Sequence, residues 1–241
     1  RQINILQTRY SWATDHCSGK DVIEIACGAG IGLGMLAENA KSVIGGDIDI
    51  TVLKYAKEHY TDRNIKLMEF DACKITLEDD SVDVVVCFEA IYYFASVENF
   101  ISEVKRILRP GGVFLCSSVN CEWSGFNPSQ YSIKYHTAKE IKKQLESIGL
   151  KTDIFFGFKD NPTTITRRFV SCIRAWSVTL RLIPKTMRGK EIFKRLFYGK
   201  LESLPTELTR SFGIVEPIIG LKDEAEIKNY NTFFVKATRQ E

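Results

Sequence analysis

The chain has 241 residues, of which 44% are hydrophobic and 26% are charged, and its formal net charge is +3. These values are typical of a soluble globular protein and exclude a mostly disordered or collagen-like chain. So small a positive charge gives no bulk signal for nucleic-acid binding, so we expect no nucleic-acid partner.

The cysteines indicate the compartment. Seven are scattered along the chain without a C-x-x-C pair, which argues against a zinc site and against a disulfide framework. We therefore expect a reducing, cytoplasmic location and no bound metal. No apolar run reaches the ~18–20 residues that a membrane-spanning helix needs.

Short apolar runs alternate with helix-like stretches over residues 1–158. This alternation predicts a doubly wound α/β fold with a parallel sheet. The motif Arg109-Pro110-Gly111-Gly112 predicts a helix end, and Thr137 with Glu140 predicts a capping box. The expected strands cover 22–26, 42–46, 65–70, 82–88, 113–117 and 153–158, and the expected helices cover 31–39, 51–60, 97–108 and 137–148.

Residues 159–228 interrupt this rhythm before a last strand at 229–238. We therefore expect a core of 1–158 completed by 229–241, with a helical basic insertion at 159–228. Within 167–200, ten basic residues stand against one acidic residue, Glu191. Three interpretations are open: a lid whose charges face water, contact with a phosphate-bearing acceptor, and peripheral contact with an anionic membrane surface.

The first strand runs into a glycine-rich turn and a helix, in the segment VIEIACGAGIGLG from Val22. Glycines let the backbone approach a ligand closely, and free N–H groups at a helix start favour a nucleotide-like or carboxylate-bearing ligand. Asp47 ends the second strand, where a carboxylate can accept from both hydroxyls of a ribose. Asp71 ends the third strand, where it can accept from an adenine amino group. A dinucleotide fingerprint would require glycine at Leu33, which disfavours a nicotinamide-dependent dehydrogenase.

This pattern resembles the class I S-adenosylmethionine-dependent methyltransferases. Glu24-x-Ala26-x-Gly28-x-Gly30 is similar to their first motif, and GGDID and FDACKI are similar to their ribose and adenine sites. LEDDSVDVVVCFEAIYYF and EVKRILRPGGVFLCSSVN are similar to their fourth-strand motif and to the helix and strand that follow. The resemblance covers roughly residues 8–158 plus the last strand. It implies a Rossmann-like sheet of seven strands, methyltransferase activity, S-adenosyl-L-methionine as cofactor, and cofactor contacts from Tyr10, Glu24, Ala26, Cys27, Gly28, Gly30, Asp47, Ile48, Asp71, Ala72 and Phe88.

A narrower resemblance concerns the acceptor. Arg9-Tyr10, ACGAGIG, CFEAIYYF and SSVN are similar to bacterial methyltransferases of glycan or cell-surface polysaccharide synthesis. Ala29 stands where that family often has Glu, and Tyr92-Tyr93 stands where it has Glu-His. The family's base therefore has no counterpart here.

Glu89, Tyr92 and Tyr93 follow the fourth strand, beside the expected methyl group, and His136 precedes the helix at 137–148 on the ligand side. In-line methyl transfer needs positioning rather than a protein nucleophile, but a hydroxyl acceptor benefits from a general base. We nominate His136, Tyr92 and Tyr93 as the catalytic residues on the acceptor side, ahead of His16 and His59. The leading hypothesis is an O-directed methyltransferase of a small molecule or glycan. A lipidic quinone-like acceptor and a non-catalytic cofactor-binding scaffold are the alternatives.

Overall fold

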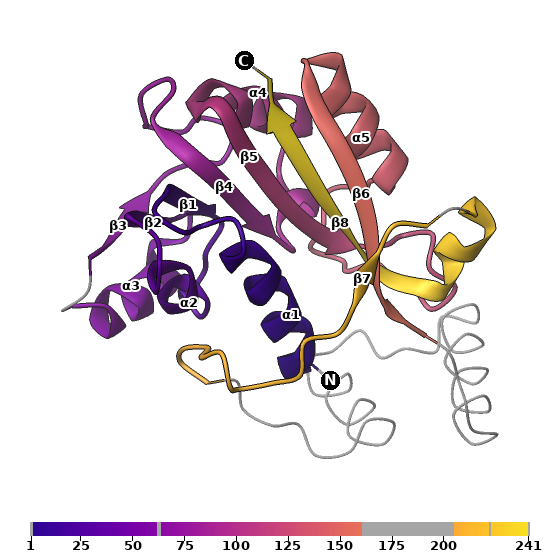
Figure 1. Cartoon of the computed structure of the whole chain (residues 1–241), viewed down its shortest axis with the longest axis horizontal. Coiled ribbons are helices and arrows are strands. Elements are labelled where there is room, and N and C mark those ends of the chain that lie inside the picture. Colours follow the sequence, from indigo (N-terminus) through magenta and orange to yellow (C-terminus); the bar gives the residue numbers. More distant parts are fainter. Residues whose placement is uncertain (1, 62–63, 161–204, 222, 241) are drawn as a thin grey trace.

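The computed structural model describes residues 2–61, 64–160, 205–221 and 223–240. These residues build one mixed sheet with helices on both faces (Figure 1). Its eight strands are β1 (Asp21–Ile25), β2 (Ser42–Asp47), β3 (Ile65–Glu69), β4 (Val82–Phe88), β5 (Leu108–Val119), β6 (Leu150–Lys159), β7 (Ile218–Ile219) and β8 (Tyr230–Arg239). The α-helices are α1 (Gln2–Thr14), α2 (Leu33–Ala37), α3 (Ile50–His59), α4 (Val97–Ile107) and α5 (Ala138–Ser147), joined by the 3-10 helices η1 (Ile91–Tyr93) and η2 (Glu224–Asn229).

The strand order places a switch point at the centre of the sheet. The order is β3-β2-β1-β4-β5-β8-β6-β7. The first five strands in this order are parallel, and β8 is antiparallel to both β5 and β6. The chain moves outward from β1 in one direction and from β4 in the other. Ligands of such sheets bind at the carboxyl ends of the strands beside this switch.

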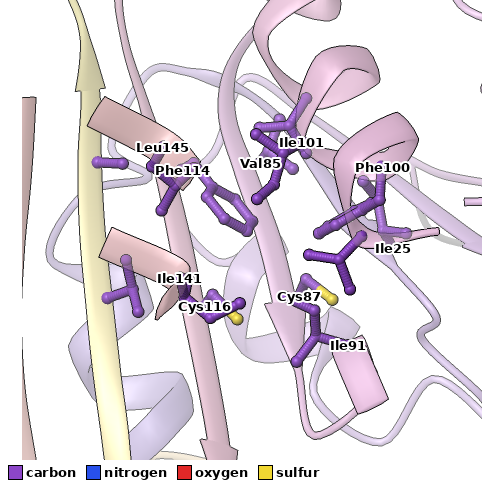
Figure 2. Packing of buried hydrophobic residues seen from close by; sticks show 14 of the residues in the cluster. Ile25, Val85, Cys87, Ile91, Phe100, Ile101, Phe114, Cys116, Ile141 and Leu145 are labelled. Carbon is purple, nitrogen blue, oxygen red and sulfur yellow. The ribbon is translucent and has the colours of Figure 1, made fainter. Parts of the chain in front are cut away.

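The central strand β4 supplies side chains to two separate cores, which explains its uninterrupted apolar sequence. Val84 and Val86 pack on the face that α1, α2 and α3 cover. Val85 and Cys87 point to the opposite face, where they lie among side chains of α4 and α5, including Phe100 (Figure 2). The expectation of a strand buried on both faces is confirmed.

Most expected elements are present, with shifted ends. The strand at 82–88 has the predicted bounds, and Thr137 and Glu140 form the predicted capping box. Helix α4 ends at Ile107, as the motif at 109–112 predicted, but β5 begins at Leu108 and not at 113, and Gly111 within it adopts a left-handed φ of 76°. The pairing with β4 is irregular at this point, since Val82 pairs with Leu108 but Val84 pairs with Val113.

Two elements were not expected from the sequence. Helix α1 buries the polar residues Gln7, Thr8 and Arg9 beside Tyr10, so it lacks a simple apolar stripe. Strand β7 pairs antiparallel with β6 and adds an eighth strand to the seven expected. The basic stretch 167–200 lies outside the described residues, and the division into a core and an insertion stays a prediction.

Candidate functional site

The loop between β1 and α2 is held in an unusual backbone conformation. Ala26, Gly28 and Gly30 all have left-handed φ angles, of 59°, 57° and 76°. At Gly30 a Cβ would lie 3.0 Å from Ala56 Cβ and 3.0 Å from Leu33 Cδ1, so packing also requires glycine there. At Gly28 a Cβ would meet no atom within 4 Å, so this part of the loop borders open space.

Two side chains fix this loop from neighbouring elements. Asp47, at the end of β2, accepts hydrogen bonds from Gly28 N at 2.8 Å and from Asp49 N at 2.9 Å. The Tyr60 hydroxyl donates to Gly30 O at 2.8 Å. These hydrogen bonds hold the loop in its shape, and the contribution of Tyr60 was not foreseen because nothing in the sequence links it to the turn.

Glu24 lies buried at the base of the loop. Tyr10 of α1 donates a 2.5 Å hydrogen bond to Glu24 Oε1, whereas Glu24 Oε2 is buried and accepts no hydrogen bond. Burial raises the pKa of Glu24 to about 8, the Tyr10 hydrogen bond opposes this rise, and the Asp47 charge adds to it. Burial likewise raises the pKa of Cys27, with Glu24 and Asp47 contributing, so this thiol stays protonated.

At the end of β4, Phe88 lies against α1. Its ring makes an edge contact with Tyr10 at a centroid distance of 5.4 Å and lies 6.4 Å from the ring of Trp12. Trp12 also packs edge-on against Phe234 of β8. The structure therefore brings Tyr10, Glu24 and Phe88 together and adds Trp12, which no motif revealed.

The remaining cofactor-side residues line the ends of β2 and β3. Ile48 is 66% exposed although it is apolar. Asp71 is exposed and accepts a hydrogen bond from Cys73 N at 2.8 Å, while Ala72 beside it is buried. These residues follow parallel neighbouring strands, so they lie at the same edge of the sheet as Asp47.

On the acceptor side, Tyr92 and Tyr93 differ in exposure. The Tyr92 hydroxyl donates to Glu89 Oε2 at 3.2 Å, and Tyr92 is buried whereas Tyr93 is 47% exposed. The backbone of Ile133 and Lys134 donates to Tyr92 O, which docks the segment before α5 onto η1. Tyr92 and Tyr93 thus lie side by side, with ring centroids 4.6 Å apart.

The histidines are placed differently. His136 is buried, its Nδ1 makes no hydrogen bond, and it lies 4.0 Å from Glu140 of α5. Burial, aided by Lys134, lowers its pKa. The charged groups that act on His136 are Lys134, Glu140 and Glu98, which lie before α5, on α5 and on α4. His59 pairs with Glu207 at 2.9 Å.

The described residues fit the cofactor that the resemblance implies. S-adenosyl-L-methionine carries a cationic amino group, and the unpartnered, buried Glu24 Oε2 can accept a hydrogen bond from such a donor when Glu24 is ionised. The open space at Gly28 admits a ligand against the backbone. Asp47 adds a carboxylate at the end of the neighbouring strand.

Residues 23–116 match the family model described as a methyltransferase domain. Over these residues the chain belongs to the class I S-adenosylmethionine-dependent methyltransferase family. The chain is 34% identical over 154 residues to a Mycolicibacterium smegmatis protein named a probable S-adenosylmethionine-dependent methyltransferase, with 61% of this chain and 58% of that protein covered. It is 26% identical over 189 residues to phthiotriol/phenolphthiotriol dimycocerosates methyltransferase 1 of Mycobacterium ulcerans, with 75% and 67% covered. The chain thus spans 41–58% of the length of the first three curated relatives.

The fold of the chain is shared with distant solved structures. It matches the YcgJ protein of Bacillus subtilis with a TM-score of 0.61 at 13% identity, covering 98% of this chain and 99% of that one. At this identity the likeness shows the fold alone. The family and the Rossmann-like α/β fold expected from the sequence are confirmed.

Among the described residues, no helix has the length and hydropathy that a bilayer crossing requires. No group of three or more His, Cys, Asp or Glu side chains is arranged to hold a metal ion within the described ranges. The six described cysteines are free thiols. The cytoplasmic location stays a prediction.

Proposed function

We propose that the chain binds S-adenosyl-L-methionine and transfers its methyl group to a hydroxyl of a small-molecule or glycan acceptor. The observation that carries this proposal is the meeting of Glu24, Gly28 and Asp47 at the carboxyl ends of β1 and β2. When bound, the cofactor supplies an electrophilic methyl group. The protein's part is then to bind, orient and exclude water, since alignment can supply ~7–11 kcal/mol of the barrier.

Each strand end has a separate part in this proposal. Both carboxylate oxygens of Asp47 already accept one backbone N–H, and each retains a second lone pair for a ribose hydroxyl. Asp71 and Ala72 would hold the adenine ring, with Ile48 as an apolar cover. Glu24 Oε2 would accept from the cofactor's amino group.

The acceptor is proposed from chemistry at the end of β4 and from the relatives. Phe88 and Tyr93 offer aromatic surface at this edge, and Glu89 lies between them in the sequence. His136 follows the segment whose backbone donates hydrogen bonds to Tyr92 O. The Mycobacterium ulcerans relative is named for an acceptor that is a triol, which supports a hydroxyl as the methylated group. The narrower resemblance to glycan methyltransferases supports a sugar.

Two measurements test the proposed function. Isothermal calorimetry should detect binding of S-adenosylhomocysteine and no binding of NAD. Transfer of a labelled methyl group should then be screened over nucleotide sugars, glycans, long-chain triols and quinols, and label should appear on a hydroxyl. A chain that binds neither form of the cofactor contradicts the proposal. Binding without transfer to any acceptor would instead favour a cofactor-binding scaffold.

A further inference from the structure

Three polar side chains from three elements meet just beyond the end of β4. Arg9 of α1 donates to Glu89 Oε1 at 2.8 Å, and Tyr92 of η1 donates to Glu89 Oε2 at 3.2 Å. The Arg9 and Glu89 side chains are 10% and 26% exposed. The carboxylate is therefore held from two sides but still open to solvent on part of its surface.

The backbone at Glu89 explains how one carboxylate reaches both partners. The Glu89 N–H donates to Ser117 O at 2.8 Å and so continues the pairing of β4 with β5. The φ angle of Glu89 itself is +54°. A non-glycine residue in this region costs ~1–3 kcal/mol and persists where the surroundings enforce it, often at functional sites. The partners come from opposite layers, since α1 packs on one face of the sheet and Tyr92 belongs to the core of the other face. A side chain that contacts both lies above the strand end, where ligands of this fold bind.

The hydrogen bonds leave the carboxylate able to receive one more donor. Each oxygen of Glu89 accepts one hydrogen bond and has a further lone pair available. Burial, together with the Glu89 charge, raises the pKa of Tyr92 well above its ordinary value, so Tyr92 stays a donor. Arg9 has no alternative carboxylate partner among the ion pairs of the described residues, so its cation is committed to Glu89.

We propose that Glu89 is the catalytic carboxylate that receives the proton of the acceptor hydroxyl, and that Arg9 and Tyr92 are positioning residues. The assignment rests on the proposed function. In this step the acceptor oxygen forms a bond to the methyl carbon, and the carbon–sulfur bond breaks with its electron pair remaining on sulfur. The hydroxyl proton passes to a Glu89 oxygen and is later released to water. Charge balances, because a sulfonium and a neutral hydroxyl give a neutral thioether, a methyl ether and one proton.

The test uses the whole chain, the hydroxyl acceptor that the wild type methylates in the screen, and separate measurement of S-adenosylhomocysteine binding. Glu89→Gln keeps the shape and an acceptor for Arg9 but removes the base, so kcat should fall at least about 100-fold with cofactor affinity unchanged within about twofold. Glu89→Gly relieves the left-handed φ, so a folded protein without activity is expected from it as well.

Arg9→Lys keeps the charge but not the planar fork, so kcat should fall while Tm and cofactor affinity are unchanged. Glu146→Gln, an exposed carboxylate change on α5, is the matched control and should match the wild type.

Several outcomes would overturn the assignment. A wild-type kcat in folded Glu89→Gln and Glu89→Gly would show that the carboxylate is not needed. A large loss of cofactor binding in Glu89→Gln would instead place Glu89 on the cofactor. Loss of kcat in His136→Ala with retention in Glu89→Gln would transfer the proton-accepting role to His136. Transfer only to thiols or amines by the wild type would remove the need for this base while leaving methyl transfer intact. Failure of the proposed function itself is separate, because it appears in the wild type as absent cofactor binding.

Discussion

The Tyr10 hydroxyl donates a 2.5 Å hydrogen bond to Glu24 Oε1, and this bond joins α1 to the first strand of the sheet. The Tyr10 ring also lies over Gly32, where a Cβ would come within 1.8 Å of Tyr10 Cε1. One tyrosine therefore contacts both the acidic residue before the glycine loop and a glycine after it. This contact holds α1 in place beside the cofactor site.

The pH dependence of stability should reveal Glu24. Its pKa is about 8 in the folded chain against an ordinary value of 4.5. Between these values the folded state keeps a proton that the unfolded state has released, so the free energy of unfolding falls as pH rises. At about 1.4 kcal/mol per pKa unit, this amounts to several kcal/mol, and Glu24→Gln should remove that part of the decline. Urea unfolding of both proteins at pH 5 and pH 8 checks this, and parallel losses in the two would contradict it.

Cofactor affinity should depend on Asp47 and not on its neighbour Asp49. Asp47→Ala removes the acceptor of Gly28 N and the proposed ribose contacts, each a charge-assisted bond worth ~1.5–3 kcal/mol. Asp49→Ala removes only the N-cap of α3, which costs ~1 kcal/mol of stability. Calorimetry with S-adenosylhomocysteine should show at least about tenfold weaker binding for Asp47→Ala alone. Equal affinity for the wild type and Asp47→Ala would refute the ribose assignment.

The two left-handed glycines of the loop should respond differently to alanine. Gly30→Ala adds the left-handed penalty, ~1–2 kcal/mol, and also crowds Ala56 and Leu33 at 3.0 Å. Gly28→Ala adds the backbone penalty without a clash inside the protein, but its methyl group enters the space proposed for the ligand. Thermal unfolding should therefore rank Gly30→Ala as less stable than Gly28→Ala. Cofactor titration should show weakened binding for Gly28→Ala even where it is fully folded.

Deleting residues 167–200 should spare cofactor binding and abolish transfer, because every proposed cofactor residue lies outside this stretch. Calorimetry and the methyl-transfer assay measure the two effects. Co-sedimentation with vesicles of anionic lipid at low and high salt tests the membrane interpretation, since each well-placed basic residue contributes ~1 kcal/mol near such a surface. Absence of sedimentation at low salt would remove the membrane interpretation and leave the other two, a lid whose charges face water and contact with a phosphate-bearing acceptor.

The sequence alone determined the parts of this protein that depend on local patterns. The strand at 82–88, the capping box at Thr137 and the glycine loop each follow from side-chain periodicity or backbone freedom over a few neighbouring residues. Asp47 and Asp71 were identified because each carboxylate follows a predicted strand. Parallel strands bring their carboxyl ends to one edge of the sheet wherever the rest of the chain lies.

Only the tertiary structure decided which distant side chains meet at that edge. Arg9 and Glu89 are 80 positions apart. Arg9 is buried in a helix without an apolar stripe, and Glu89 has a left-handed backbone. No local rule predicts either feature. Tyr60 and Trp12 reach the site in the same way, through packing of whole elements against the sheet. The motifs thus identified the residues proposed for the cofactor, while the residues proposed for the acceptor side meet through long-range contacts that no short stretch of sequence records.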